Sequence, residues 1–429
     1  MEDLNLINAR IPIGGRLIEA GISIGDGKIV SVAKRGLLPK ANKTEDLGGA
    51  ILMPGAVDSH VHFRDPGQNE KEDFNTGSKA AVAGGVTTIC DMPNTLPPTD
   101  TLERFSEKKK IGERKSLVDF GLHAMFPESL EMGKELMEAG AVSLKLYPEI
   151  TDYTEIKNYD GTDVLISIHP EDPSVVSEMS GTDAEAFIES RPRSAEVSEI
   201  EKSLNLTSDL RLHFCHLSTK EALAFIGKVK GKRRISCEVT PHHLLLGLSD
   251  LRDMGPIAKM HPPLRTARDR KALLRGLENG LVDIIATDHA PHTYEEKKLN
   301  FREAPPGVVG VETSLPLLFT LFRRGRLSLF KMLELLCYAP ARIFGLYNEN
   351  GIPKGTIMPG SDADLVAVDH RREWRIRGED LHGRSKFTPF QGMKVEGKPF
   401  LTVVRGKIMF RNGNVIGGKG HGRFIEAET

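Results

Sequence analysis

Two histidines and one arginine are spaced by single residues in the stretch 55–67, just after a short apolar run. Because side chains alternate along an extended strand, His60, His62 and Arg64 are expected on the same side of it. Two imidazoles at one strand end can bind a divalent metal ion. An arginine beside them can bind a carboxylate through two parallel hydrogen bonds. The pattern therefore predicts a metal site with an anion-binding group next to it.

Further candidate residues lie inside or at the end of later apolar runs. Lys145 lies inside the run 142–147, where a lysine is costly unless it is paired, neutralised or modified. His169, His216 and Asp288 each close such a run. Imidazoles, a lysine and an aspartate at strand ends suit a two-metal hydrolytic site, in which divalent ions convert a bridging water into hydroxide. Carboxylated by carbon dioxide, the lysine would be a carbamate, an anion able to bridge both metals.

Some alternatives stay open from the residues alone. His213 and His216 are three residues apart on one strand and face opposite sides, so only one of them can be a ligand. Taken singly, Lys145 could be an ion-paired core lysine and His169 a hydrogen-bonded core histidine. Their joint position at strand ends favours the metal site. Structural or supporting roles are expected for four other histidines: His123, His242, His243 and His289.

The elements that must position these residues alternate between strand and helix from Pro54 onward. Strands are expected at 55–63, 86–92, 117–125, 141–147, 164–169, 212–217, 235–240 and 283–287. Helices are expected between several of them, at 72–83, 101–110, 130–139, 195–204, 220–229 and 267–278. This alternation predicts an α/β fold, a (β/α)8 TIM-like barrel whose site lies at the carboxyl ends of the strands. A doubly wound open sheet is the main alternative, and candidates at so many strand ends favour the barrel.

Short strands flank this pattern at both ends of the chain. Near the start, strands are expected at 5–11, 16–24 and 28–33, with Gly-Gly and Asp-Gly turns typical of hairpins. After helical runs at 312–323 and 327–337, strands are expected before Asp369 and at 374–377, 400–405 and 407–410. We expect residues 1–52 and 346–429 to form one small β-sandwich domain and residues 53–345 to form the metal-dependent catalytic barrel. The glycine-rich tail from Gly417 is expected to be mobile.

Composition limits the partners of the protein. The formal net charge is -1, from 58 Lys+Arg against 59 Asp+Glu, so there is no basic excess for nucleic acid or for a membrane surface. No apolar run approaches the ~20 residues of a membrane span, and the acidic N-terminal residues, with no apolar stretch, lead us to expect no signal peptide. Four scattered cysteines favour a reducing compartment over a disulfide framework. We therefore expect a cytoplasmic enzyme with a small-molecule substrate.

At this point the chain resembles the dihydroorotases, the cyclic amidases of pyrimidine biosynthesis within the amidohydrolase superfamily. The resemblance runs to about residue 412 and is carried by these segments: 60–67, 91–95, 145–147, 288–292, 305–310 and 361–366. It implies reversible ring closure of N-carbamoyl-L-aspartate to (S)-dihydroorotate, on the route to UMP. A homodimer or a complex with other enzymes of the pathway is compatible with it.

The resemblance also implies the metal centre. Two Zn2+ ions per subunit would be held by six residues: His60, His62, Lys145, His169, His216 and Asp288. Lys145, as its carbamate, would bridge the metals, and a match to His-Leu-Ser selects His216 over His213. Asp288 would act as general base and then acid for a metal-bridged hydroxide.

Substrate residues follow from the same resemblance. Arg64 and Asn94 would bind the ring carboxylate of dihydroorotate, which dihydrouracil and a plain hydantoin lack, and losing such a bond costs ~1.5–3 kcal/mol. Further contacts are implied for His292, Pro306 and Gly307. His261 stands where many relatives have a substrate-contacting asparagine, so its role stays open.

Two other functions remain as alternatives. An allantoinase or hydantoinase would share the barrel and the metals, but Arg64 together with Asn94 argues against it. A catalytically inactive scaffold for other pyrimidine enzymes would be expected to have lost ligands, whereas all six ligand positions are filled.

Overall fold

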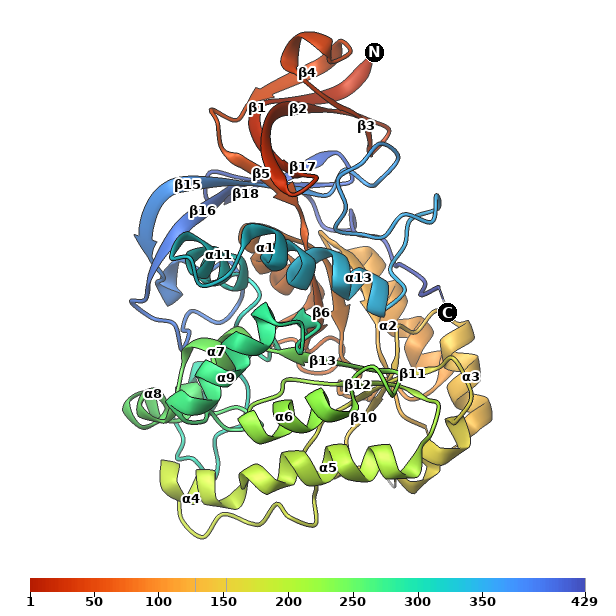
Figure 1. Cartoon of the computed structure of the whole chain (residues 1–429), viewed down its shortest axis with the longest axis vertical. Helices are drawn as coiled ribbons and strands as arrows, with labels where there is room; N and C mark the ends of the chain where they lie inside the picture. Colours follow the sequence, from red (N-terminus) through yellow and green to blue (C-terminus); the bar gives the residue numbers. More distant parts are fainter. Residues whose placement is uncertain (128, 152, 429) are drawn as a thin grey trace.

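The barrel predicted from the sequence is confirmed by the computed structural model, which describes residues 1–127, 129–151 and 153–428 (Figure 1). Within those ranges the parallel strands are β6 (Ala56–Val61), β7 (Val86–Asp91), β8 (Asp119–Leu122), β9 (Ala124–Met125), β10 (Leu144–Leu146), β11 (Leu165–Ile168), β12 (Arg211–Phe214), β13 (Ile235–Val239) and β14 (Ile284–Ile285). They form one set from β6 to β8 and another from β9 to β14. Only His123 separates β8 from β9, and an isolated parallel bridge pairs Val61 of β6 with His289, which follows the end of β14.

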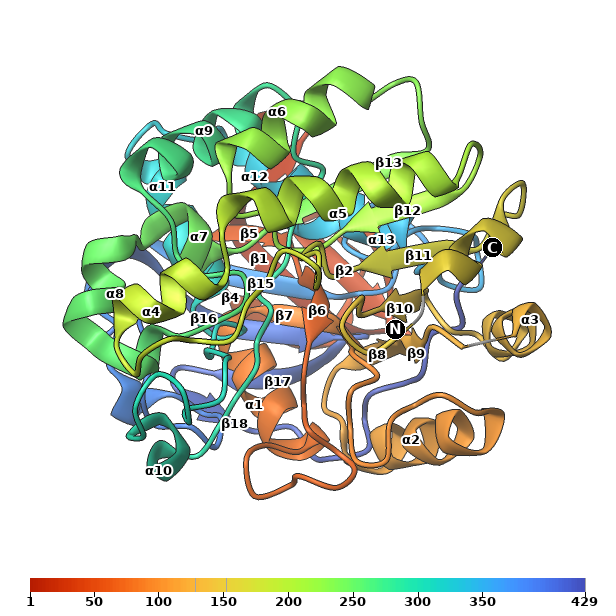
Figure 2. The same ribbon diagram turned by 90° about the horizontal axis from the view of Figure 1, so that it is seen from below.

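Helices surround these strands, as the view from below shows (Figure 2). The helices are α1 (Phe74–Gly84), α2 (Leu102–Lys115), α3 (Leu130–Glu138), α4 (Ala184–Ser190), α5 (Arg193–Leu206), α6 (Lys220–Val229), α7 (Pro241–Leu245), α8 (Leu248–Met254), α9 (Ala267–Glu278), α10 (Tyr294–Lys297), α11 (Ser314–Arg323), α12 (Leu329–Leu333) and α13 (Ala339–Ile343). Local sequence sets the limits of α1, because Asp73 and Thr76 form a capping box and Gly85 ends the helix with a φ of 82°. Every residue of β6 and β7 is buried, as expected for strands covered on both faces.

The small β domain joins the two ends of the chain. Its strands are β1 (Glu2–Ile13), β2 (Arg16–Gly25), β3 (Lys28–Ala33), β4 (Ala41–Asp46), β5 (Ile51–Pro54), β15 (Leu365–Arg375), β16 (Lys394–Val404), β17 (Lys407–Arg411) and β18 (Asn414–Val415). The order is β18-β17-β16-β15-β5-β1-β2-β3, with β4 beside β1, so β5 and β15 connect the early strands to the late ones. These strands pack around their own core, as predicted for a small β-sandwich. The residue limits of the two domains stay a prediction, and residue 429 lies outside the described residues.

One residue connects this domain to the first barrel strand. Gly55 alone separates β5 from β6, and a Cβ atom there would collide with the side chain of Thr87. A glycine is therefore required for the close approach of β6 to β7. The strand that carries His60, β6, is in this way fixed to a large sheet.

The segment between β15 and β16 leaves the β domain and packs on the barrel. Ile376 and Phe390 join a hydrophobic core with Leu251 of α8 and with Phe301. Backbone N–H groups of this segment donate to two glutamates of the barrel, His382 to Glu312 and Arg384 to the buried Glu72.

The prediction of a mobile tail is wrong for its last residues. Phe424 packs against Phe105 and Phe120, and the backbone of residues 423 and 425 pairs with that of Phe120. The glycines gave no indication of this aromatic residue, which fixes the tail against β8 and α2.

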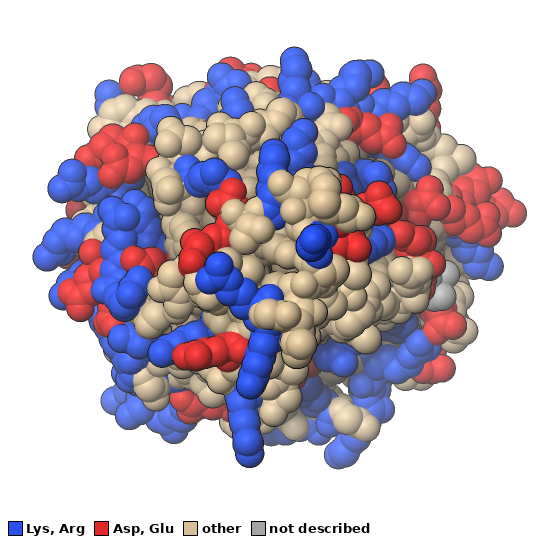
Figure 3. All heavy atoms as spheres, turned by 90° about the horizontal axis from the view of Figure 1, so that it is seen from above, with Lys and Arg blue, Asp and Glu red and all other residues tan. Residues whose placement is uncertain are grey.

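On the surface, acidic and basic side chains alternate over the face seen from above (Figure 3). Among the described helices we find none with the length and apolar content that crossing a bilayer requires.

Candidate active site

The eleven residues predicted from the sequence all line one cavity of about 260 Å³. They are His60, His62, Arg64, Asn94, Lys145, His169, His216, Asp288, His292, Pro306 and Gly307. The cavity lies at the carboxyl ends of the barrel strands, where this fold carries its sites. Within the described residues, His60, His62 and Asp288 also form a cluster compact enough to hold a metal ion.

The rings of His60 and His62 have the same arrangement. In each ring Nε2 faces Oδ1 of Asp288, at 3.3 Å for His60 and 3.1 Å for His62. The opposite nitrogen, Nδ1, is held from outside, by Glu238 at 2.5 Å in His60 and by the side-chain carbonyl of Asn94 at 2.6 Å in His62. Outer partners of this kind fix the tautomer and the orientation of metal-binding imidazoles.

A second pair of imidazoles faces inward on the other side of the cavity. Nε2 of His169 lies 3.1 Å from Glu171, and its Nδ1 lies 3.1 Å from Nε2 of His216. Two facing ring nitrogens can share one proton or bind one cation. Nδ1 of His216 is buried and has no hydrogen-bond partner among the described residues.

The choice between His213 and His216 is explained by their partners. Both nitrogens of His213 are used away from the cavity, Nδ1 with Ser236 at 2.8 Å and Nε2 with Glu238 at 3.1 Å. His216 lines the cavity instead, and its backbone N–H donates to Glu238. His123 is a core residue as expected, since its ring bonds a serine hydroxyl and a backbone carbonyl.

Lys145 is fully buried on β10 at the cavity wall. Its Nζ atom donates to Sγ of Cys215 at 2.8 Å. Among the described residues no carboxylate forms an ion pair with it. A buried ammonium without an anion is unfavourable, so this position suits a modified side chain better than an ammonium.

Charge distribution in the site favours a cation between the carboxylates. Burial alone would raise the pKa of Glu238, but the imidazoles of His60 and His213 outweigh it and hold the pKa well below its ordinary value. Burial would likewise raise the pKa of Asp288, and His60 and His62 lower it instead. Burial disfavours a charged His60, yet the two carboxylates raise its pKa to about 10. Without a metal ion, a proton on His60 supplies the positive charge that these carboxylates require.

Three of these side chains are presented by a strained backbone. Arg64, His216 and Asp288 have φ angles of 61°, 33° and 48°, in a region that residues other than glycine rarely adopt. Such outliers cluster at functional sites because the surrounding structure over-determines them. Each one turns the chain sharply where a barrel strand ends.

Arg64 is buried, with 8% of its surface exposed, and has no ion pair among the described residues. Its Nε donates to the carbonyl of Pro291 at 3.2 Å, and its Nη2 lies 3.2 Å from Nε2 of His292. Burial lowers the pKa of the guanidinium, which still remains a cation at neutral pH. Burial and then Arg64 lower the pKa of His292 to about 2, so this imidazole is neutral. Arg64 is thus a buried cation at the cavity wall that forms no ion pair with any described carboxylate.

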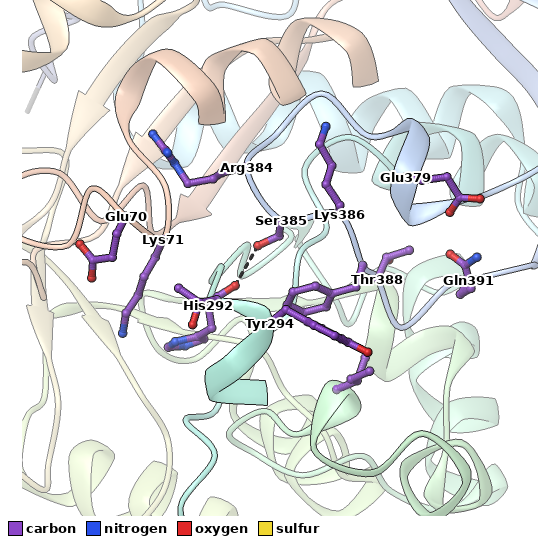
Figure 4. Close-up of a pocket in the computed structure, with 13 residues that line it drawn as sticks. Glu70, Lys71, His292, Tyr294, Glu379, Arg384, Ser385, Lys386, Thr388 and Gln391 are labelled. Atoms are coloured by element: carbon purple, nitrogen blue, oxygen red, sulfur yellow. Dashed lines mark hydrogen bonds between the residues drawn. The ribbon is translucent and has the colours of Figure 1, made fainter. Parts of the chain in front are cut away.

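A larger pocket of about 610 Å³ adjoins this cavity at His292 (Figure 4). There the hydroxyl of Ser385, from the segment between β15 and β16, donates to the carbonyl of His292 at 3.0 Å. The segment between β15 and β16 therefore supports the loop that carries His292.

Sequence reasoning missed several residues of the site. Glu238 bonds three of the histidines described above, and Cys215 contacts Lys145. A glutamate inside the apolar run 235–239 is the same signal that singled out Lys145, so Glu238 could have been found. His261, whose role was left open, lines the cavity and stacks on Phe187, with ring centroids 5.7 Å apart.

Comparisons with known proteins agree with this geometry. The model of the Amidohydrolase family matches residues 51–181 and 182–409. A dihydroorotase of Methanothermobacter thermautotrophicus is 40% identical over 100% of this chain and 98% of its own length. An L-hydantoinase of Paenarthrobacter aurescens is 33% identical over 99% of this chain and 98% of its own length. The solved L-hydantoinase (dihydropyrimidinase) from Arthrobacter aurescens superimposes with a TM-score of 0.92 at 33% identity, over 99% of this chain and 100% of that one.

Proposed function

This chain belongs to the amidohydrolase family and, within it, to the dihydroorotases, and we propose that its cavity closes N-carbamoyl-L-aspartate reversibly to (S)-dihydroorotate with release of water. The cytoplasm as location, and a homodimer or a complex with other pyrimidine enzymes, are part of the proposal. The four cysteines are free and buried, which suits a reducing compartment.

The observation that carries the proposal is the unpaired guanidinium of Arg64. A buried cation without an anion is expected to bind one, and the ring carboxylate of dihydroorotate fits a planar donor pair. The amide of Asn94 lies in the same cavity. Because its carbonyl accepts from His62, its N–H groups are left to donate to the same carboxylate.

The residues fit a pair of metal ions. Inward-facing ring nitrogens, an ionised aspartate and the buried, unpartnered Nδ1 of His216 are a donor set suited to zinc. We assign two Zn2+ ions to His60, His62, Lys145, His169, His216 and Asp288. Bound there, the ions would supply an activated water and polarise the ring carbonyl.

Lys145 enters this assignment as its carbamate. A carbamate retains one N–H, and Sγ of Cys215 is placed to accept it. The modification converts an unpaired buried cation into an anion among four imidazoles, which removes the cost of burying the ammonium.

The protein's own groups orient the substrate and move the proton. Arg64 and Asn94 hold the carboxylate, while His292, Pro306 and Gly307 face the ring. In the hydrolytic direction Oδ1 of Asp288, kept ionised by its neighbours, accepts the proton of the attacking water and gives it to the leaving ring nitrogen. Ring closure uses the same proton in reverse.

A second candidate is a hydantoinase, because the L-hydantoinase structure covers the whole chain. An assay of the zinc-supplied protein on dihydroorotate, allantoin and dihydrouracil, with products identified by mass, separates the two. Turnover of dihydroorotate alone is expected. Turnover of allantoin or dihydrouracil instead would refute the carboxylate assignment, and no turnover by metal-loaded protein would favour the inactive scaffold.

A further inference from the structure

Several buried lysines lie outside the proposed catalytic set, and two of them differ from the others in their partners. Lys297, the last residue of α10, is 1% exposed, and Lys259 is 5% exposed. Among the described residues neither forms an ion pair with a carboxylate. Buried ammonium groups are rarely left without an anion, so their surroundings require an explanation.

Backbone carbonyls take the place of the anion. Nζ of Lys297 donates to the carbonyls of Lys259, Pro305 and Gly307, at 3.1, 3.0 and 2.8 Å. Three acceptors require three N–H groups, which an ammonium has and a neutral amine lacks. Nζ of Lys259 donates to two further carbonyls, of Phe301 and Ala304, in the same loop.

Two of the three carbonyls that Lys297 bonds belong to the turn 305–307 at the cavity wall. Pro305 and Gly307 flank Pro306, whose own carbonyl lies 2.9 Å from Nε2 of His292. Pro306 and Gly307 line the cavity, and the N–H of Gly307 donates to the carbonyl of Lys259. The position of this turn therefore depends on the groups that Lys297 bonds.

We propose that Lys297 is the positioning residue that fixes the turn 305–307 against the substrate, and that its ammonium form and the anionic substrate favour each other. The proposal deepens the proposed function and rests on it for the identity of the anion. It adds a residue that touches neither metal ligand nor substrate.

Electrostatics supports the coupling. The charged groups that act on Lys297 are Lys259 and Arg64, both cations, and Glu296, which is itself bound by Lys71 at 2.8 Å. Burial, and then Lys259, lower the pKa of Lys297 to about 7. A carboxylate bound at Arg64 would offset the positive charge of this cluster and so stabilise the ammonium. Linkage makes the effect reciprocal, so protonation of Lys297 strengthens substrate binding.

The test compares Lys297→Met with Lys298→Met in the zinc-loaded enzyme. Lys298 is the next residue, but it is exposed and pairs with Glu295, so its variant controls for loss of one lysine from this segment. For Lys297→Met we expect KM for dihydroorotate to rise by about tenfold or more, with kcat within about threefold. Metal content should stay unchanged, and amide hydrogens of residues 307–310 should exchange faster. The control should resemble the wild type.

Two results would overturn the proposal. Unchanged amide exchange in Lys297→Met would show that the lysine does not hold the turn. Faster exchange with an unchanged KM would show that the turn does not contact the substrate. Amide hydrogen exchange does not depend on which cyclic substrate the enzyme hydrolyses. If the wild type opens only uncharged hydantoins, the proposed function fails, and KM for a hydantoin still tests the positioning role.

A second variant covers the case in which Lys297→Met does not fold. Lys297→Arg keeps a permanent charge, so it should abolish the proton uptake that accompanies binding of an unreactive carboxylated pyrimidine such as orotate. Calorimetry of wild type and variant in buffers of different ionisation enthalpy, above pH 7, measures that uptake. Equal uptake in both, or none in the wild type, would refute the coupling.

Discussion

The side-chain carbonyl of Asn94 lies 2.6 Å from Nδ1 of His62, and this contact joins the proposed metal centre to the proposed carboxylate site. One amide thus has two tasks, to orient an imidazole through its oxygen and to donate to the substrate through its nitrogen. Substitutions can separate them, because an aspartate retains the acceptor and loses the donor.

Asn94→Asp should retain metal and lose substrate affinity. The carboxylate still accepts from His62, whereas it repels the substrate carboxylate, so kcat/KM for dihydroorotate should fall by at least about tenfold. Asn94→Ala removes both tasks and should also weaken metal affinity by about 10–100-fold. Metal content after dialysis, measured beside steady-state kinetics, distinguishes the variants. Equal metal loss in both would contradict the role of the oxygen.

Arg64→Met should change the substrate preference rather than abolish catalysis. Removing the guanidinium costs a charged hydrogen bond of ~1.5–3 kcal/mol, about 10–150-fold in kcat/KM on dihydroorotate, and should affect an uncharged hydantoin little. Arg384→Met is the matched control, since Arg384 is an exposed cation of the adjoining pocket (Figure 4). An equal loss of kcat/KM on dihydroorotate and on the hydantoin would show that Arg64 supports the fold of the site instead.

Glu238→Gln should weaken metal binding while the barrel stays folded. Glu238 bonds His60 through one oxygen and His213 through the other, and an amide can accept at only one of these. We expect metal affinity to fall by about 10–100-fold, measured by competition with a chelator. Glu149→Gln, in the same cavity but exposed, should leave affinity unchanged. Unaltered affinity in Glu238→Gln would mean that His60 keeps its orientation without the carboxylate.

Lys145→Arg tests the carbamate. Arginine retains a positive charge and cannot form a stable carbamate, so the variant should bind less metal per chain than the wild type and lose activity. Metal-free wild type should in turn need bicarbonate together with zinc to recover activity. Crystal density or an intact mass showing a free amine in active, metal-loaded protein would refute the modification.

Much of the barrel was predictable because its signals are local. His60 and His62 ended an apolar run, and every residue of β6 is in fact buried. By contrast, β4 was missed because its residues, 41–46, are mostly polar and mostly exposed, and nothing in their pattern indicates a strand. Its partner is β1, at the start of the chain, and that pairing supplies what the local sequence does not.

The partners of the site residues were not predictable in the same way. Glu238 follows His60 by 178 residues, so only the closed barrel brings them to 2.5 Å. The sequence pattern can place His60 and Glu238 on strands of the same barrel. It cannot show which ring nitrogen each carboxylate oxygen bonds. Lys297 was hidden for the same reason, since its partners are backbone carbonyls and carry no residue signature.

The buried charge of Lys297 predicts opposite effects of pH on stability and on substrate affinity. Its pKa is about 7 in the folded protein against an ordinary value of 10.5. Below pH 7 both states hold the proton, and between pH 7 and 10.5 the unfolded state binds one proton more. The free energy of unfolding therefore rises with pH in that window, by up to about 1.4 kcal/mol per pH unit.

Lys297→Met isolates this contribution, because the other titrating groups are common to both proteins. The stability of the wild type relative to the variant should increase from pH 7 toward pH 10, whereas its KM advantage should shrink as the ammonium is lost. Urea unfolding and initial rates over the same pH series measure the two quantities. Parallel stability curves would show that Lys297 keeps its proton throughout, and the turn 305–307 would then be held at every pH.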